Sequence, residues 1–535
     1  MLLYSNILIL NNLIHFMDLF KNWKKDIPAS IVVFFVALPL CLGVALASGA
    51  PVFSGIIAGV IGGIIIGFLS KSPIGVSGPA AGLVVIVLNA ITDLGAYELF
   101  LVAVVLAGIF QILLGILKAG VIGYYFPSAV IKGMLCAIGI SIFLKQIPLA
   151  LGYTDNLDVM SADLLSFDIS KVTIGAIVIT AISLFILIFW DNVLGKKSNF
   201  FKLLPGSLVA VCVGILYQIT IGGSNHEVFA IDKDLLVKVP VPESVTDFIG
   251  QFILPDFASG LTNPLVWQVA ITIAIVGSLE TLLSVEATDK LDPLKRQTPT
   301  NRELIAQGIG NSLSGFIGGL PITQVIVRSS ANAMSGGLTK LSTIMHGVLL
   351  LVSIVSIPMF LNLIPNAVLA SILLVIGYKL GNPKQFLDMK KLGKDQLIPF
   401  AVTVIAILAT DLLKGIIIGL VIGVVVSLIK SYNNSHVMLI KEGNLFHMNF
   451  AEEVTFVNRG AIVKELDGLE PGSILELDVR KTKILDYDII EYLDEFKVKA
   501  KNNNIHIRLI SERGTVDNPT SFREFFGYVI VAGAH

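Results

Sequence analysis

One basic residue of the sequence lies in a stretch that is otherwise apolar. Arg328 follows Val325-Ile326-Val327 and stands seven residues after Pro321. If this stretch lies in a membrane, the charge costs about 2.5 to 3.5 kcal/mol, so it should face a cavity, a partner or a substrate. We interpret Arg328 as a group that attracts an anion, with a structural ion pair as the alternative.

A carboxylate that could pair with Arg328 occurs at Glu280. Glu280 and Ser284 are four residues apart and therefore share one helix face. Beside an anion site, Glu280 could accept a proton or bind a cation for coupled transport, or it could serve only as the counter-ion of Arg328. The sequence leaves these roles open.

Two short apolar runs each follow glycine and proline. Ser77-Gly78-Pro79 precedes the run 80–90, and Gly318-Gly319-Leu320-Pro321 precedes the run 322–334. Neither run is long enough to cross a bilayer alone. Glycine lets an extended segment approach closely and proline suits the first turn of a helix. We therefore predict an extended lead-in followed by a half-helix, beginning near Pro79 in one case and near Pro321 in the other.

Such half-helices would point their unpaired N–H groups and positive dipole ends at the middle of the membrane. Two such ends together attract an anion. Thr323 and Gln324 would add side-chain donors where the second half-helix begins. The alternative is a pair of ordinary proline-kinked helices, which the matched occurrence of the two runs disfavours.

The composition indicates a membrane protein. Of 535 residues, 54% are apolar and 14% are charged, against about 25% charged in soluble domains. The net charge of −1 and the scattered basic residues exclude a nucleic-acid partner. The three cysteines and seven histidines have no metal-ligand spacing. We therefore expect no metal and no cofactor, apart from a co-transported proton or sodium ion.

Apolar runs recur along the chain and predict fourteen transmembrane helices, because a bilayer requires internally satisfied backbone groups. The first seven are 28–48, 51–70, 79–92, 97–117, 121–147, 171–190 and 203–222. The second seven are 264–285, 302–317, 321–336, 340–360, 364–380, 396–411 and 413–430. A cytosolic segment 1–27 would precede this transport domain, 28–430, and a separate domain, 436–535, would follow it. The first sixteen residues make a poor signal peptide, and Met17 is an alternative start to Met1.

Loop charges predict the orientation. Lys and Arg gather after the sixth, eighth and twelfth spans, while the loop 148–170 carries four aspartates and no basic residue. Basic loops stay in the cytoplasm, so both termini should be cytoplasmic.

Prolines predict an internal repeat, about 28–222 and 264–430. Pro28 and Pro264 open the first span of each series (264 − 28 = 236), Pro79 and Pro321 the third (321 − 79 = 242), and Pro127 and Pro365 the fifth (365 − 127 = 238). The offset is nearly constant, which is typical of duplicated carriers. Because each half has an odd number of spans, the second half should be inverted relative to the first.

The C-terminal part is different in character. Two strand-like runs, 474–479 and 505–510, flank a stretch from Asp488 to Asn502 with apolar residues at helical spacing. Strand, helix and strand predict a small α/β domain.

Taken together, several segments resemble those of the SulP sulfate permease family of anion transporters. The segments are 76–81, 277–280, 319–321, 328–330 and 335–339. The resemblance covers the chain from about Asp26 to its end. It implies a polytopic α-helical protein with two inverted repeats of seven segments, divided into a core and a gate subdomain, that works as a homodimer by elevator-like alternating access. It implies a location in a bacterial inner (plasma) membrane, in contact with lipid.

The same resemblance implies which residues contact the substrate. They are Ala80 and Ala81 at one half-helix start and Gln324, Val325 and Ile326 at the other, with Glu280 and Ser284 opposite. In sodium-coupled bicarbonate members, an aspartate that ligates sodium is similar in position to Glu280. The segment that ends at Arg328 departs from those members and resembles animal anion exchangers and prestin, which argues against sodium coupling.

The tail resembles a STAS domain. Where soluble relatives carry Asp-Ser-Ser with a phosphorylatable serine, this chain reads Asp486-Tyr487-Asp488. Regulation by serine phosphorylation is therefore not expected there, and docking or dimer contact is the expected role.

The function predicted is secondary transport of small inorganic anions, namely sulfate, bicarbonate or chloride. A nucleobase–cation symporter of the same fold is the alternative, against which Arg328 and the STAS-like tail argue. An anion channel would differ only in whether both gates can open together. An enzyme would need a nucleophile–base pair or a metal cluster, and the sequence suggests neither.

Overall fold

The computed structural model describes residues 20–121, 127–153, 172–194, 197, 201, 204–223, 228–241, 244–410, 412–433, 436–440 and 444–527. The two alternative starts, Met1 and Met17, lie outside these residues. So do the four aspartates of the loop 148–170. The chain forms two compact units, one of residues 1–387 with 403–417 and the other of residues 388–402 with 418–535.

A helix occurs in each of the fourteen predicted spans. In the first half these are α2 (Trp23–Ala47), α3 (Val52–Gly63) with α4 (Ile65–Leu69), α5 (Val84–Leu94), α6 (Tyr97–Ile116), α7 (Ser128–Ala150), α8 (Ile174–Phe189) and α11 (Gly206–Tyr217). In the second half they are α14 (Pro264–Leu291), α15 (Thr300–Phe316), α16 (Ile326–Met334), α17 (Lys340–Ser356), α19 (Asn366–Leu380), α21 (Lys394–Ala409) and α22 (Leu412–Asn433). Seven of the described helical segments are long and apolar enough to cross a membrane by length and composition.

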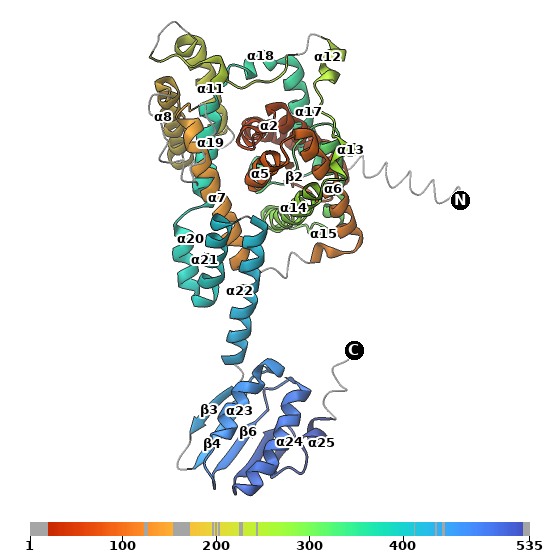
Figure 1. Ribbon diagram of the computed structural model, residues 1–535, viewed down its shortest axis with the longest axis vertical. Coiled ribbons are helices and arrows are strands. Elements are labelled where there is room, and N and C mark those ends of the chain that lie inside the picture. Colours follow the sequence, from red (N-terminus) through yellow and green to blue (C-terminus); the bar gives the residue numbers. More distant parts are fainter. Residues whose placement is uncertain are drawn as a thin grey trace, which may run out of the picture. The chain divides into compact units, whose positions relative to one another are not determined.

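The helices of the first unit form two groups (Figure 1). One group packs α2, α3, α6, α14, α15 and α17 around a pair of short strands. The other packs α7, α8, α11 and α19 together, at the left of the view. These groups correspond to the core and gate subdomains that the family resemblance implies.

Three glycine pairs allow close helix crossings. A Cβ on Gly63 would lie 2.6 Å from the Cα of Gly347, one on Gly108 2.5 Å from the oxygen of Gly308, and one on Gly139 2.7 Å from the oxygen of Gly377. The partners correspond between the halves at nearly one offset (347 − 108 = 239; 308 − 63 = 245; 377 − 139 = 238). Small residues let membrane helices approach closely. The crossings thus follow the inverted repeat that the prolines predicted.

In one of the three pairs, both prolines open their helices as predicted. Pro127 and Pro365 both cap the N-terminus of their helices, and Pro264 is the first residue of α14. Pro28, however, lies inside α2, which begins five residues earlier at Trp23. A proline this close to a helix start removes one hydrogen bond near the end of the helix, where the freed carbonyl can bind water instead.

The second unit contains a five-stranded sheet in the order β3-β4-β6-β8-β9. The strands are β3 (His436–Ile440), β4 (Leu445–Phe450), β6 (Ile474–Asp478), β8 (His506–Ser511) and β9 (Gly514–Asp517). The central strands β4, β6 and β8 are parallel, and both outer strands are antiparallel to their neighbours. The short strands β5 (Glu453–Val454) and β7 (Ile484–Leu485) pair separately.

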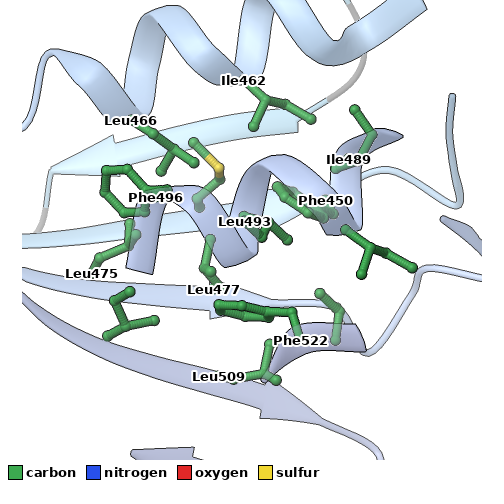
Figure 2. Packing of buried hydrophobic residues seen from close by; sticks show 14 of the residues in the cluster. Phe450, Ile462, Leu466, Leu475, Leu477, Ile489, Leu493, Phe496, Leu509 and Phe522 are labelled. Carbon is green, nitrogen blue, oxygen red and sulfur yellow. The ribbon is translucent and has the colours of Figure 1, made fainter. Parts of the chain in front are cut away.

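The sheet of this unit is covered by helices on the face that carries its apolar side chains. Figure 2 shows Leu475, Leu477 and Leu509 of the sheet beneath Leu493 and Phe496 of α24 (Tyr487–Asn502). The helices α23 (Arg459–Asp467) and α25 (Phe522–Gly527) contribute further apolar residues to the same core. The predicted strand, helix and strand are present, with α24 beginning one residue before the predicted Asp488.

Candidate functional site

Two strands, one from each half, cross at the centre of the core group. β1 (Ser77–Pro79) pairs antiparallel with β2 (Ile322–Gln324), with Gly78 opposite Thr323. Each strand leads through one extended residue into a helical segment. Ala80 precedes a 3₁₀ turn (Ala81–Leu83) that continues into α5, and Val325 precedes α16. Because the strands are antiparallel, one helix begins at each end of the strand pair.

The half-helices therefore begin later than predicted. Pro79 is the last residue of β1 and Pro321 stands directly before β2, so neither proline lies in the first helical turn. Isoleucine, threonine and valine favour extended backbone, and proline is tolerated at the end of a strand because it lacks an N–H group. Residues 322–324 consequently form the strand rather than the helix start that was expected at Pro321.

The N-cap residues of the two helix starts are Ala80 and Val325, whose side chains have no hydrogen-bonding group. Neither Ala80 nor Val325 makes a side-chain hydrogen bond to the N–H groups that follow it. The first N–H groups of a helix have no partner within the helix and carry its positive dipole end. Ala81 and Val325 are half-buried and Ile326 is 38% exposed. These are the predicted substrate contacts that the structure brings to an accessible position.

The other predicted contacts of this segment lie deeper. Thr323 and Gln324 are fully buried and face α14. The Gln324 side chain donates to the hydroxyl of Thr288 at 3.2 Å, and its backbone N–H donates to that of Thr281 at 3.4 Å. The Thr323 hydroxyl has no hydrogen-bond partner. Because both residues belong to the strand, their side chains are not at the helix start as predicted.

Arg328 reaches from the second half into the first. Its side chain is fully buried, and Nη2 donates to the Sγ atom of Cys41 and to the carbonyl oxygen of Pro79, each at 3.4 Å. Its Nε and Nη1 groups have no hydrogen-bond partner among the residues that the structure describes. Within the described residues, no carboxylate lies at ion-pair distance from Arg328. The alternative of a structural ion pair with Glu280 is therefore not what the structure shows.

Glu280 contacts the first helix start instead. Its carboxylate accepts a hydrogen bond from the backbone N–H of Gly82, in the 3₁₀ turn that precedes α5, while Oε2 has no hydrogen-bond partner in the described part of the chain. A negative charge is stabilised at this end of a helix. Ser284, one turn further along α14, is buried and its carbonyl oxygen accepts a hydrogen bond from Thr288.

Both charged side chains rest on glycines of the first half. A Cβ on Gly78 would lie 2.9 Å from the Cζ atom of Arg328 and closer still to Nη1. A Cβ on Gly82 would lie 2.6 Å from Oε2 of Glu280. Side-chain atoms do not approach a Cβ so closely, so any larger residue at either position would displace the charged group. Gly78, predicted as a helix breaker, thus makes room for Arg328.

The turn before β2 is fixed by the end of α15. Gly318 has a φ of 87°, a conformation that favours glycine. The backbone N–H of Gly319 donates to the carbonyl of Ser314 at 2.7 Å, and the Ser314 hydroxyl donates to the carbonyl of Leu320 at 2.7 Å. Gly319 and Pro321 therefore shape the turn that leads into the strand.

A polar stripe on α15 holds the strand pair and was not predicted from the sequence. Asn311 accepts from the backbone N–H of Ile322 at 2.6 Å and donates to its carbonyl at 3.0 Å. Gln307 donates to the hydroxyl of Ser77 at 2.7 Å and to Glu303 at 2.9 Å. The signal was present, because Glu303, Gln307 and Asn311 recur every four residues in a predicted membrane span.

The chain before β1 is held by α16 in turn. The Ser329 hydroxyl accepts from the backbone N–H of Val76 at 3.0 Å, and Asn332 donates to the carbonyl of Ile74 at 2.9 Å. Each half therefore satisfies backbone groups of the other around the strand pair, which fixes the two helix starts relative to one another.

The sequence is similar to those of known proteins. The profile described as Sulfate permease family matches residues 23–406. The Bacillus subtilis protein YvdB, whose name marks it as a candidate sulfate transporter, is 28% identical over 513 residues, which cover 92% of this chain and 91% of that protein. The bicarbonate transporter BicA of a Picosynechococcus strain is 27% identical over 379 residues, 69% of this chain and 63% of that protein.

Solved structures show the same fold. The transmembrane domain of a cyanobacterial bicarbonate transporter BicA superposes with a TM-score of 0.62 at 24% identity, covering 76% of this chain and 98% of that one. Murine Solute Carrier 26 family member A9, an anion transporter in its inward-facing state, superposes with a TM-score of 0.71 at 14% identity, covering 91% of this chain and 85% of that one. The chain belongs to the sulfate permease family.

Proposed function

We propose that this protein is a secondary transporter that carries small inorganic anions, namely sulfate, bicarbonate or chloride, across a bacterial inner membrane by alternating access. The observation that carries the proposal is the buried Arg328 without a carboxylate partner in the described residues, together with two helix starts whose N-cap residues, Ala80 and Val325, offer no side-chain cap. A buried cation requires compensation, and a mobile anion supplies it.

The positions of the donors support an anion between the two helix starts. The backbone N–H groups that follow Ala80 and Val325 are directional hydrogen-bond donors. Arg328, whose Nη2 donates to the carbonyl oxygen of Pro79 in β1, would act on the anion mainly through its positive charge. Fixed donors that surround an anion from two sides are the recurring arrangement at broken membrane helices. Ala80, Ala81, Val325 and Ile326 would contact the anion, with Thr323, Gln324 and Ser284 behind them.

The names of the relatives support the same class of substrate. YvdB is named as a candidate sulfate transporter, BicA as a bicarbonate transporter, and a mouse relative that is 24% identical over 303 residues as a chloride anion exchanger. These names agree on inorganic anions and differ in which anion is carried.

Glu280 supports coupling to a proton or a sodium ion. Its carboxylate occupies the positive end of the first half-helix, where it repels an anion at the same place. Protonation of Glu280, or a cation bound to it, would remove this repulsion. Anion and coupling ion would then bind together, which is the thermodynamic requirement for symport.

Transport by movement of the core group against the gate group would follow from the division into two helix groups (Figure 1). We further propose a homodimer, with a STAS-like domain of residues 436–535 and both termini in the cytoplasm. The alternation of basic and acidic loops supports this orientation. No enzymatic step is part of the proposal.

Transport assays test this proposal. Purified protein in liposomes should take up labelled sulfate, bicarbonate or chloride, and uptake should be compared with labelled uracil, with and without a sodium or proton gradient. Uptake of uracil but of no anion would favour the nucleobase symporter and overturn the proposal. Currents of many ions per opening event would indicate a channel.

Replacement of Arg328 provides the matched variant. Arg328→Ala should lower anion uptake at least about tenfold, because it removes a charge that acts through a medium of low polarity. Lys290→Ala, which removes an exposed basic residue near the end of α14, is the control and should transport normally. Unchanged uptake in a folded Arg328→Ala protein would remove Arg328 from the site.

A further inference from the structure

Arg328 has polar neighbours, but no carboxylate of the described residues lies within ion-pair distance of its guanidinium. Among the described residues, its hydrogen-bond acceptors are the Sγ atom of Cys41 in α2 and the carbonyl oxygen of Pro79 in β1, each at 3.4 Å. A thiol is a weak hydrogen-bond partner, and a buried thiol packs much like a small apolar side chain. Neither acceptor compensates the guanidinium charge as a carboxylate would.

Cys41 is held in this position by its packing. The residue is fully buried, and α3 passes so close that a Cβ on Gly59 would lie 2.6 Å from Sγ. The thiol therefore cannot move toward α3 and away from Arg328. An acidic side chain at position 41 would therefore lie beside the guanidinium as its counter-ion. In this chain the position holds a thiol, which has no formal negative charge.

The contact also lies next to a helix start. Pro79, whose carbonyl accepts from Nη2, is followed directly by Ala80, the residue before the first helical turn, Ala81–Leu83. A charge placed at position 41 would consequently change both the state of Arg328 and the potential at that turn. Charge at this position should matter more than size or hydrogen-bonding capacity.

We propose that position 41 determines charge selectivity in this transporter: Cys41 keeps Arg328 uncompensated and able to attract an anion, and a carboxylate at position 41 would cancel that attraction. The inference rests on the proposed function and deepens it, since it assigns a specificity-determining role to a residue of α2 that lies outside both broken helices. Position 41 would act on the anion through Arg328, by the charge that it carries or lacks, and not by contact with the anion.

A pair of variants with nearly the same shape isolates the charge. Cys41→Asp adds a carboxylate beside Nη2 of Arg328, and Cys41→Asn adds an amide of similar size without charge. Full-length proteins in liposomes would be compared for KM and maximal rate, with whichever of sulfate, bicarbonate and chloride the wild type transports fastest. We expect Cys41→Asp to raise KM about tenfold or more and Cys41→Asn to stay within about threefold of wild type.

Equal KM values for the two variants would overturn the inference, because size and polarity would then explain the effect. If Cys41→Asp does not fold, Cys41→Ser and Cys41→Ala decide the matter. Both leave the charge unchanged, so each should keep KM within about threefold of wild type, and a rise of about tenfold or more in either would overturn the inference.

Uptake by the wild-type protein separates failure of the proposed function from failure of the role proposed for position 41. Absence of anion uptake by the wild-type protein under every ion condition would overturn the proposed function and the inference together. Normal wild-type uptake with equal KM values in the Asp and Asn variants would overturn only the role of position 41.

Discussion

Arg328 and Glu280 carry opposite charges, and both rest on glycines that belong to the first half of the chain. Gly78 receives the guanidinium of Arg328, and Gly82 donates to the carboxylate of Glu280. The two charged residues themselves belong to the second half. At the scale of single residues, the site is therefore asymmetric, with small residues from one half and ionisable side chains from the other.

Gly78→Ala should impair the protein strongly. The new Cβ would lie 2.9 Å from the Cζ of Arg328, so the buried guanidinium would have to move. We expect a destabilisation of about 1 to 3 kcal/mol, the usual cost of overpacking, with loss of anion uptake. Thermal unfolding in detergent and liposome uptake measure the two effects.

Gly43→Ala is the control, since a Cβ there meets its neighbours at 3.5 Å or more. Combining Gly78→Ala with Arg328→Ala should restore stability without restoring transport. A Gly78→Ala protein that unfolds and transports like the wild type would contradict the proposed contact.

Glu280→Gln should uncouple transport from its driving ion. Glutamine keeps the shape of the side chain, but its amide neither takes up a proton near neutral pH nor repels an anion. Uptake should therefore lose its dependence on a proton or sodium gradient, while anion exchange persists. Uptake measured with and without each gradient tests this. Glu286→Gln, at an exposed position on the same helix, should retain the dependence. Gradient dependence that survives in Glu280→Gln would assign Glu280 a structural role only.

At the scale of elements, the strand pair is held by side chains rather than by a larger sheet. Asn311 of α15 satisfies both backbone groups of Ile322. Backbone groups without hydrogen-bond partners inside a membrane are costly in free energy. α15 therefore stabilises the strand pair by supplying hydrogen bonds that a third strand would otherwise supply.

Asn311→Leu tests this role. Leucine has a similar volume but leaves the N–H and carbonyl of Ile322 without partners, at about 1 to 3 kcal/mol each. We expect a clear fall in the midpoint of thermal unfolding and a loss of uptake. Ser312→Ala, on the neighbouring face of α15, removes a single hydrogen bond of 3.3 Å and should change both little. A stable and active Asn311→Leu protein would show that the strands do not depend on α15.

The helices could be predicted from the sequence because each span is a long apolar run, a signal that is local. The repeat could be predicted because proline changes helix geometry wherever it occurs. The positions of Thr323 and Gln324 could not, since the short strand β2 exists only by pairing with β1, about 245 positions earlier. The hydrogen-bond partners of Arg328 could not be predicted either. Cys41 lies 287 positions away in the sequence, and no local pattern indicates that a thiol will contact a guanidinium.

At the scale of the whole molecule, the helix crossings at glycine pairs and the pairing of β1 with β2 both follow from the inverted repeat. Each crossing of the core group has its counterpart in the other half, and the gate crossing of Gly139 with Gly377 joins equivalent helices. An inverted repeat with seven segments places the loop between the halves on the side opposite to both termini.

Labelling of single cysteines tests this orientation. In a Cys212→Ser background, which removes the exposed native thiol, Lys238→Cys should react with a membrane-impermeant maleimide in intact cells, and Lys391→Cys should react only after lysis. Both lysines have well-exposed side chains, at 66% and 79%. Reaction of Lys391→Cys in intact cells would invert the proposed topology.

The contact between Gly78 and Arg328 makes two positions, one in each half of the chain, depend on one another. The guanidinium of Arg328 keeps its observed place only while position 78 lacks a Cβ, whereas a glycine at position 78 leaves room for side chains other than arginine at position 328. The dependence is therefore one-sided: loss of the arginine leaves Gly78 without a clash, and loss of the glycine displaces the arginine.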